Sequence, residues 1–176
     1  AVVTAIGSSG ITTDGDYAVT LSAGTAAAAD LNTIAGDTSG AINASLVTTI
    51  TGTAANILSA AAAGTITTKA DYAATVNSGT ASVANINTLD ADTTGVITAT
   101  VTEGDLSTLK TVDDANSNNA LAITVTDTSA AAADLNTVDG LTTVAITATA
   151  VETITGTAAA VVTAIGSSGI TTDGDY

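Results

Sequence analysis

Short turns rich in aspartate are the sharpest candidates for chemistry in this sequence. Asp14 and Asp16 flank a glycine, and the same three residues return at 173–175. Asp113 and Asp114 form a second acidic pair. Because Ca²⁺ binds through several oxygen ligands, closely spaced aspartates in a turn can supply part of a site. The sequence therefore contains two calcium candidates.

The same turns also fit a simpler interpretation as solvated loops, which is the one we favour. Calcium-binding nonapeptide repeats need a fuller Gly-Gly-x-Gly-x-Asp pattern, which this chain lacks. The turn that corresponds to 14–16 in the next repeat, 69–71, reads Lys-Ala-Asp, so the acidic pair does not recur there. We therefore expect no metal or other cofactor, and the alternative is calcium at Asp14, Asp16, Asp113 and Asp114.

Enzymatic activity finds little support in the composition. The chain has no His, Cys or Arg, which excludes His-based acid–base catalysis, thiol nucleophiles and Ser–His pairs. The two glutamates, Glu103 and Glu152, lie in no motif. The glycines at 7 and 10 lack the following Lys-Ser/Thr that completes a phosphate-binding loop. We expect that the protein is not an enzyme.

Two sets of polar residues recur at regular places. The first is an asparagine for which we expect hydrogen bonds to the turn backbone of a neighbouring repeat, and its members are Asn32, Asn87 and Asn136. The second is a run of alternating threonines that could order water against ice if the array were regular, namely Thr98, Thr100 and Thr102. The matching positions in the first repeat are Asn43 and Ser45. The array is therefore imperfect, and threonine is also an ordinary exposed strand residue.

Charge and side-chain size narrow the function further. The formal net charge is −15, so nucleic acid and anionic membrane surfaces are poor partners. No apolar run approaches the ~20 residues that span a bilayer. The mean hydropathy is +0.47, yet the apolar set is Ala, Val, Ile and Leu with only three Tyr. Such side chains fill a thin core, which favours an elongated stack of repeats.

The clearest feature of the sequence is a long internal repeat. Residues 1–17 return letter for letter at 160–176, an offset of 159 residues. A repeat of this length and identity indicates tandem duplication. We therefore expect 1–159 to be one full period and 160–176 to be the start of the next copy in a longer array.

A second, blurred repeat divides this period. Three segments share an Ala-x-Leu/Ile-Asn-Thr pattern, and they lie at 26–36, 81–91 and 130–140. A Thr-Ile-Thr-Gly-Thr-Ala-Ala motif occurs at 49–55 and 153–159, but its middle copy, at 105–119, is degraded. The period therefore comprises three doublets of two units each, and the doublets span roughly 1–50, 51–105 and 106–159.

Each unit of about 27 residues is predicted to hold a short helix and a short strand. Ala-rich stretches such as Thr25–Ile34 predict helices, because Thr is a good N-cap and Ala the best helix former. Alternating β-branched and small residues predict strands at 18–21, 41–44, 73–76, 96–100, 121–125 and 145–149. We expect a mixed α/β repeat solenoid with one helix and one parallel strand per unit and six units per period. The alternative is an all-β solenoid with two or three strands per unit.

The motifs ADLNTIxG and TITGTAA resemble the Ala/Thr/Asp-rich tandem repeats of giant secreted and cell-surface proteins of marine cyanobacteria and other aquatic bacteria. The resemblance covers essentially the whole chain and includes no catalytic residue. It implies an extracellular repeat protein with a surface, adhesive or filament-forming role. The degraded middle copy and the very high identity between successive periods depart from that pattern.

We therefore expect a structural component of an extracellular filament or giant cell-surface fibre. Neither end of the sequence reads as a capping repeat, so a stack of these units should propagate. The expected partner is another copy of the chain, joined head to tail or bundled laterally, with no nucleic acid and no membrane insertion. The alternative is an adhesin or binding module that presents an Asp or Thr face to calcium, a surface or ice. A designed consensus repeat is a third, weaker interpretation.

Overall fold

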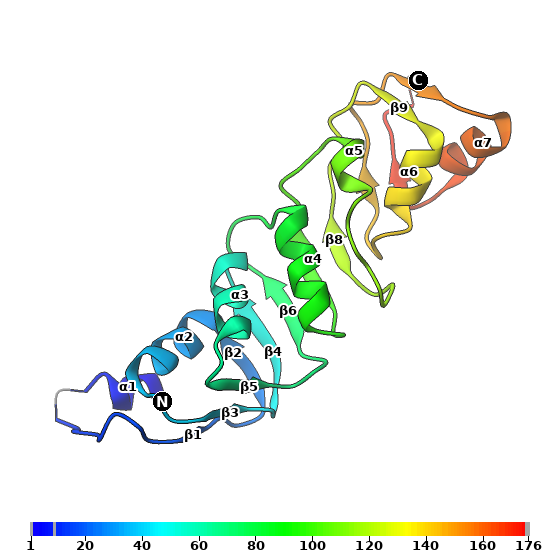
Figure 1. Ribbon diagram of the computed structural model, residues 1–176. Coiled ribbons are helices and arrows are strands. Elements are labelled where there is room, and N and C mark those ends of the chain that lie inside the picture. The colour runs from blue at the N-terminus through cyan, green and yellow to red at the C-terminus, as the bar shows by residue number, and fades with distance from the viewer. Residues whose placement is uncertain (1, 9, 175–176) are drawn as a thin grey trace.

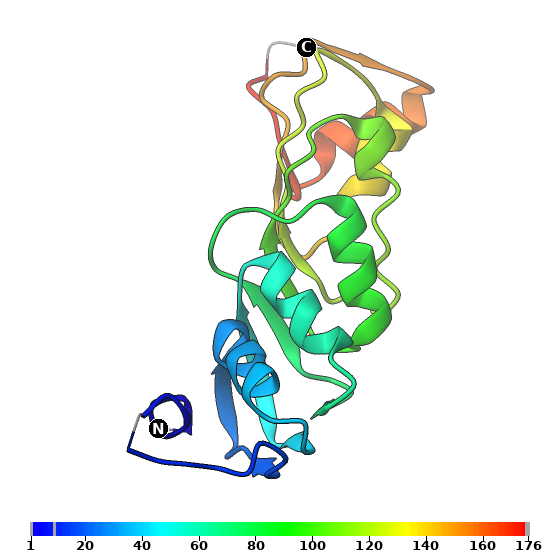
Figure 2. The same cartoon turned by 60° about the vertical axis from the view of Figure 1, so that its left-hand side comes forward.

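The computed structural model describes residues 2–8 and 10–174, and this part of the chain is elongated with its ends far apart (Figure 1; Figure 2). Its helices are α1 (Val2–Ile6), α2 (Ala28–Asp37), α3 (Ala54–Ala62), α4 (Val83–Asp92), α5 (Leu106–Leu109), α6 (Ala132–Asp139) and α7 (Ala158–Gly166). Its strands are β1 (Val19–Thr20), β2 (Gly24–Ala27), β3 (Ile42–Ala44), β4 (Val47–Gly52), β5 (Ile66–Thr68), β6 (Ala73–Val76), β7 (Ile97–Thr100), β8 (Ala120–Ala122), β9 (Ser129–Ala131), β10 (Ile146–Thr147), β11 (Thr153–Thr155) and β12 (Ile170–Thr171).

Every strand pairing in the described residues is parallel. The longest sheet has the order β2-β4-β6-β7-β8, and three smaller sheets are β1-β3-β5, β9-β11 and β10-β12. Paired residues lie about one unit apart, since Ile42 pairs with Ile66 and Ile50 with Ala74. The predicted mixed α/β class with parallel strands is confirmed, and the helices rule out the all-β alternative.

Most neighbouring helices are separated by two strands rather than the single strand that the sequence predicts. Between α2 and α3, the strand predicted at 41–44 is β3, and β4 follows it after a corner at Ser45 and Leu46. The residues of β4 directly precede the N-cap of α3, so in the sequence they read as the lead-in to that helix. The strands predicted at 73–76 and 96–100 are confirmed as β6 and β7.

The start of α2 also differs from the prediction. Thr25 lies in β2 instead of capping the helix, which begins at Ala28. The N-cap residue is Ala27, and it makes no side-chain hydrogen bond. Because β2 pairs with β4, the ladder hydrogen bonds outweigh the helix preference of the alanines, which is only a weak local bias.

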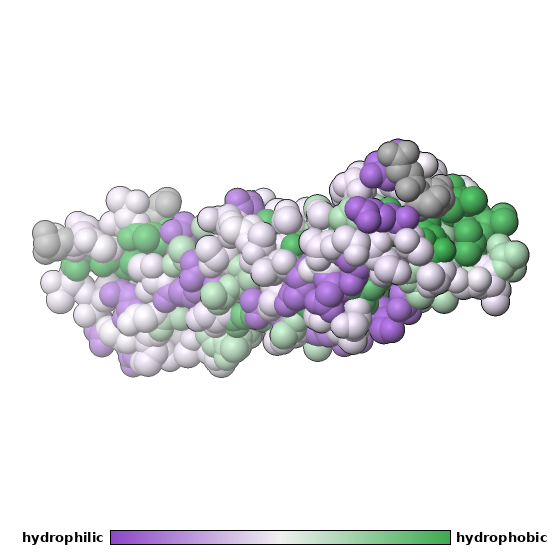
Figure 3. All heavy atoms as spheres, turned by 90° about the horizontal axis from the view of Figure 1, so that it is seen from above, coloured by the Kyte–Doolittle hydropathy of each residue, from purple (hydrophilic) through white to green (hydrophobic). Residues whose placement is uncertain are grey.

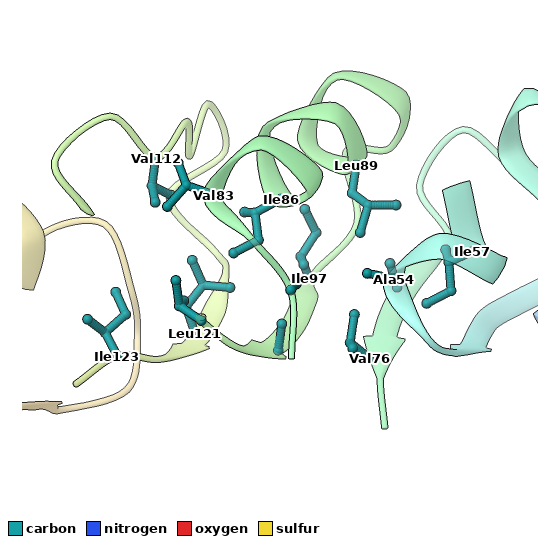
Figure 4. Packing of buried hydrophobic residues seen from close by; sticks show 14 of the residues in the cluster. Ala54, Ile57, Val76, Val83, Ile86, Leu89, Ile97, Val112, Leu121 and Ile123 are labelled. Atoms are coloured by element: carbon teal, nitrogen blue, oxygen red, sulfur yellow. The ribbon is translucent and has the colours of Figure 1, made fainter. Parts of the chain in front are cut away.

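An apolar core runs between the helices and the strands along the molecule. The longer helices turn residues at i, i+3 and i+6 toward it, as with Val83, Ile86 and Leu89 of α4. Figure 4 shows Ile86 and Leu89 on the strand side of α4, above Ile97 and Leu121. The buried apolar residues form a single cluster from Val19 to Ile170. Ala, Val, Ile and Leu suffice for this core because it is thin, enclosed by a single row of helices and by the strands of the adjoining sheets.

A Gly-Thr pair explains how the chain passes from β4 into α3. Gly52 has a φ of +152°, and a Cβ at that position would lie 3.4 Å from the Cβ of Ala28 in the previous helix. Thr53 then caps α3 by accepting a hydrogen bond from the backbone N–H of Asn56 at 3.2 Å. Thr157 caps α7 in the same way. The glycine therefore permits a close approach and the threonine starts the helix.

The degraded middle unit folds into a shorter version of the same element. Its helix α5 has four residues, whereas α3 and α7 have nine each. Asp105 replaces the threonine cap and accepts a hydrogen bond from the N–H of Thr108 at 2.9 Å. Hydrogen bonds from Ser107 and then Thr108 lower the pKa of the Asp105 carboxyl. The unit has lost its Gly-Thr-Ala-Ala and has kept a capped helical turn.

Candidate functional site

The repeated segment occupies two different settings in the molecule. In the first copy, α1 packs against α2, which follows it in the chain. In the second copy, the same sequence forms most of α7, which packs against α6, the helix before it. Asn136 of α6 also donates a hydrogen bond to the carbonyl of Ala160 at 3.1 Å. One sequence is therefore observed with a neighbour after it in one place and a neighbour before it in the other.

The helix of the repeated segment differs in exposure between the two copies, α1 and α7. Val162 and Ile165 of α7 are 65% and 47% exposed. Their equivalents in α1, Val3 and Ile6, are half-buried and pack against the core. Figure 3 shows hydrophobic side chains gathered at the C-terminal end of the molecule, where α7 lies. The face of the helix that α1 turns toward the core is therefore bare in α7.

Other residues of the segment show the reverse difference, because they are exposed in the first copy and buried in the second. Ile11 is 51% exposed, whereas its equivalent, Ile170 in β12, is 9% exposed. Ala5 is exposed, whereas its equivalent Ala164 is buried. The part of the segment that α6 and β10 cover in the second copy is therefore bare in the first. Taken together, the two copies show two apolar faces of one segment, each covered once and bare once.

Two strands have free edges beside these surfaces. In the described residues β11 pairs only with β9, and β1 pairs only with β3. The internal equivalent of β11 by sequence is β4, which pairs with both β2 and β6. The internal equivalent of β1 is β6, which pairs with both β4 and β7. Each free edge therefore has an internal counterpart whose edge is filled.

Asparagine side chains connect successive units, as the sequence predicts. Asn32 donates to the carbonyl of Asn56 at 3.0 Å, and Asn87 donates to the carbonyl of Thr111 at 2.9 Å. With Asn136, all three bonds span 24 residues. The acceptors of Asn32 and Asn136 lie in the next helix rather than in a turn. These three asparagine bonds therefore set the offset between neighbouring units.

A tyrosine and a threonine also connect successive units, at the C-terminal end of α4. The hydroxyl of Tyr72, which is fully buried, donates to Oδ2 of Asp92 at 2.7 Å. Its backbone carbonyl accepts from Oγ1 of Thr93 at 2.6 Å, and that same Oγ1 accepts from the N–H of Gly95 at 3.0 Å. A Cβ on Gly95 would collide with the carbonyl of Tyr72. We call this set the tyrosine clasp.

The tyrosine clasp recurs one doublet earlier and is reduced in the third doublet. Tyr17 donates to Asp37, and the carbonyl of Tyr17 accepts from Oγ1 of Thr38 at 2.6 Å. In the third doublet Leu121 stands in place of the tyrosine, so the bond from a phenol to a carboxylate is lost. Thr142 still donates to the carbonyl of Leu121 at 2.9 Å and accepts from the N–H of Val144 at 3.2 Å. The bond to Asp37, with partial desolvation, raises the pKa of Tyr17 to about 12.

The first calcium candidate is used as part of a turn. Asp14 and Asp16 are exposed, and Gly15 between them has a φ of +82°. The carbonyl of Gly15 accepts from the N–H of Ser39 at 3.0 Å. The turn therefore supplies a backbone acceptor to the next unit. In the second copy of this turn, Asp175 lies outside the described residues.

The second calcium candidate, Asp113 and Asp114, lies in a separate turn, away from 14–16 (Figure 1). The N–H of Asp113 donates to Oδ1 of Asn87 at 2.8 Å, and Oδ1 of Asp114 accepts from the N–H of Asn118 at 3.2 Å. Within 2–8 and 10–174, no three His, Cys, Asp or Glu residues gather as a metal-binding group. The N–H of Asp113 and the carboxylate of Asp114 therefore stabilise the loop that follows α5.

The predicted threonine face is narrow. Thr98 and Thr100 are exposed on β7. Thr98 has Thr75 beside it in β6, but its partner in β8 is Ala120, and Thr100 faces Ala122 there. The row of hydroxyl groups therefore ends at β8 and does not extend into a regular array.

Sequence reasoning missed the tyrosine clasp and the unequal coverage of the repeated segment. The clasp has a readable signal, because Tyr17 and Tyr72 each lie 20 residues before an Asp-Thr-x-Gly sequence. The coverage has no such signal, since identical residues have opposite exposure. Burial depends on which helix lies alongside, and that is a tertiary property.

Comparison with known proteins links the chain to none of them, since no protein-family model, no curated protein and no solved structure matches it. None of the described helices is both long enough and apolar enough to cross a membrane. The function must therefore be inferred from the residues and contacts described above.

Proposed function

We propose that this chain is a structural component of an extracellular filament or giant cell-surface fibre, built from solenoid units stacked end to end. The observation that carries the proposal is the complementary coverage of the repeated segment. Val162 and Ile165 are exposed where Val3 and Ile6 are half-buried, and Ile11 is exposed where Ile170 is buried. A segment that lay between an α6 before it and an α2 after it would have both faces buried.

The interior of the molecule supports continuous stacking. The asparagine bonds and several strand pairs repeat at a step of 24 residues, as for Ile42 with Ile66 and Ile50 with Ala74. Each unit contacts the units beside it, and the energy of such a stack is close to a sum of unit and neighbour terms. Nothing in this pattern limits the number of units, so the stack can grow along one axis.

The apolar face of α7 favours a neighbour over water. Val162 and Ile165 lie one helical turn apart and are among the few large apolar residues of the described chain that are exposed. Burying an aliphatic side chain of this size stabilises by roughly 1.5–3 kcal/mol. A following α2-like helix would obtain that stabilisation, as α2 already does with α1.

Charge and composition fit a fibre outside the cell. The net charge of −15 keeps parallel rods from collapsing onto one another at low salt. Lys69 and Lys110 are the only basic residues, and each forms an ion pair, with Asp71 at 2.9 Å and Asp134 at 3.2 Å. Few sites remain for trypsin-like proteases. The location outside the cell rests on this composition and on the resemblance of the repeats.

The test is electron microscopy of the native material with an antibody to the degraded unit, 105–119. This sequence occurs once per period, so the label should decorate a surface fibre at even intervals. The interval should lie between about 29 Å, if the strand spacing sets the advance of six units, and about 60 Å, if the helix spacing does. Pre-immune serum, and the same antibody with the 105–119 peptide added as competitor, are the controls. Label on isolated particles, or at irregular intervals along a fibre, would contradict the proposal.

A further inference from the structure

We propose that Val162 and Ile165 of α7, together with the free edge of β11, form a docking site for a second copy of this chain, which presents its α2 and β1. We call the surface formed by Val162 and Ile165 the α7 face. This inference rests on the proposed function and specifies how two copies meet. It also requires that α1 of the second copy move away from α2, because α7 takes its place.

The contacts of the first copy of the segment identify the occupant. Val3 and Ile6 hold the positions in α1 that Val162 and Ile165 hold in α7, and α1 packs against α2. The arrangement occurs a second time inside the chain, since α3, the internal equivalent of α7, packs against α4. Helix α4 shares its Leu/Ile-Asn-Thr pattern with α2. Two internal interfaces therefore predict an α2 on the α7 face.

The strand edges predict the register of the junction. Thr49 pairs with Ala73 and Ile50 with Ala74 in the β4–β6 pair. The equivalent residues place Thr153 beside Ala18 of the second copy and Ile154 beside its Val19. Both edges are unpaired in the described residues. Docking therefore adds one parallel strand pair that neither molecule has alone.

A groove beside α1 leaves room for a longer helix on α2. It is lined by the first residues of α1, by α2 and by nearby strands and loops, including Val2, Val3, Leu21, Ala27, Leu31 and Ile34. Helix α7 begins at Ala158, three residues before Val161, the equivalent of Val2. In the docked pair those three residues extend the helix into the groove.

Docking exchanges the contact of α1 with α2 inside one chain for a contact of α7 with α2 between two chains, so the contacts that are lost are replaced by equivalent ones. The segment that leaves α2 and the segment that replaces it have the same sequence, so the contacts at α2 are alike before and after. The added strand pair and the filled groove favour the exchanged state. The contact is head to tail, with different surfaces on the two molecules, so it continues into a filament and does not close into a dimer.

The test uses one pair of substitutions placed in each copy of the segment. We expect the mass of the native chain in sedimentation equilibrium to rise with concentration from 16.7 kDa to twice that value or more. V162D/I165D should stay at the mass of one chain, because it places charge on the α7 face. V3D/I6D should assemble at lower concentration than the native chain, because it weakens only the packing of α1 on α2 within one chain, which docking has to displace. Far-ultraviolet circular dichroism of both variants checks that they fold.

Disulfide trapping tests the register independently, since the chain has no cysteine of its own. A mixture of T153C and A18C chains should form a disulfide-linked pair, because directly paired residues come within disulfide range. T155C with A18C is the control, because it is two residues out of register on the same face. Equal loss of assembly in both aspartate variants, or a native chain that stays single and gives no T153C–A18C bond, would overturn the exchange. The antibody labelling of native fibres would still decide the proposed function, because covalently joined periods can make the same contacts.

Discussion

At the scale of single residues, the tyrosine clasp is a buried polar contact between units. Tyr72 is fully buried, and its hydroxyl has a carboxylate partner, Asp92, at 2.7 Å. Burial, and then the bond to Asp92, raise the pKa of Tyr72 well above its usual range. The folded protein therefore holds the neutral phenol, which can donate to the carboxylate.

The clasp predicts a dependence of stability on alkaline pH. The pKa of Tyr72 is higher in the folded than in the unfolded state, where it is about 10. Its contribution is therefore complete below pH 10 and is lost as the pH rises toward the folded pKa. Y72F should lower the free energy of unfolding by about 1–2 kcal/mol at pH 7, and the gap to the native chain should narrow above pH 10. Urea unfolding of both proteins at pH 7, 9 and 11 measures this, and a gap that stays constant to pH 11 would refute it.

At the scale of elements, the helices depend on their caps and on their neighbours more than on alanine content. Helix α3 begins at a threonine that makes its capping bond, whereas α2 begins after an alanine that makes none. The strand pairing of β2 with β4 moves the N-cap of α2 from the predicted Thr25 to Ala27, a delay of two residues. Local preference therefore decides the helix start only where no ladder competes for the same backbone.

Two threonines test this difference between cap and interior. Thr53 accepts the bond from Asn56 at the start of α3, whereas Thr33 donates from inside α2 to the carbonyl of Ala29 at 2.8 Å. T53A should lower the free energy of unfolding by about 1 kcal/mol. T33A should leave it unchanged or raise it by up to about 0.5 kcal/mol, since alanine is the better helix former. Urea midpoints of the two variants decide the point, and equal effects would show that the cap has no special role.

At the scale of the whole molecule, we propose that the repeated segment is the place where one period meets the next. In each of its two copies, one apolar face of the segment is packed against a neighbouring helix and the other is exposed. In the proposed stack, every copy of the segment lies between an α6 and an α2. The stability of that segment should therefore depend on whether a following copy is present.

A chain with two periods in tandem, 1–159 followed by 1–176, tests this dependence. The amides of Val162 and Ile165 should exchange with solvent more slowly in the inner copy of the tandem chain than in the single chain. Covering these two side chains stabilises the helix by about 2 kcal/mol or more, which slows local opening by more than tenfold. Hydrogen exchange read by mass spectrometry gives the answer, and the outer copy of the segment serves as the internal control. Equal exchange in both copies would mean that the following period does not cover α7.

Much of the local structure follows from the sequence alone. The helix at the Ala-rich stretch of each unit and the strands at 73–76 and 96–100 follow from alternation and helix preference, which act over a few residues. The link made by Asn32, Asn87 and Asn136 also follows, because one polar residue at one place in each repeat meets the same neighbour each time. The mixed α/β class follows from the same patterns.

Only the tertiary structure decided the rest. It placed Thr25 in a strand, because pairing with β4 is a contact between residues far apart in the chain. It turned the hydroxyl of Tyr72 toward Asp92, whereas at Leu121 only the threonine part of the clasp, made by Thr142, is kept. It also gave identical residues opposite exposure, as with Ile11 and Ile170. The sequence of a repeat determines its two faces, whereas the exposure of each face is decided by the neighbour that lies against it.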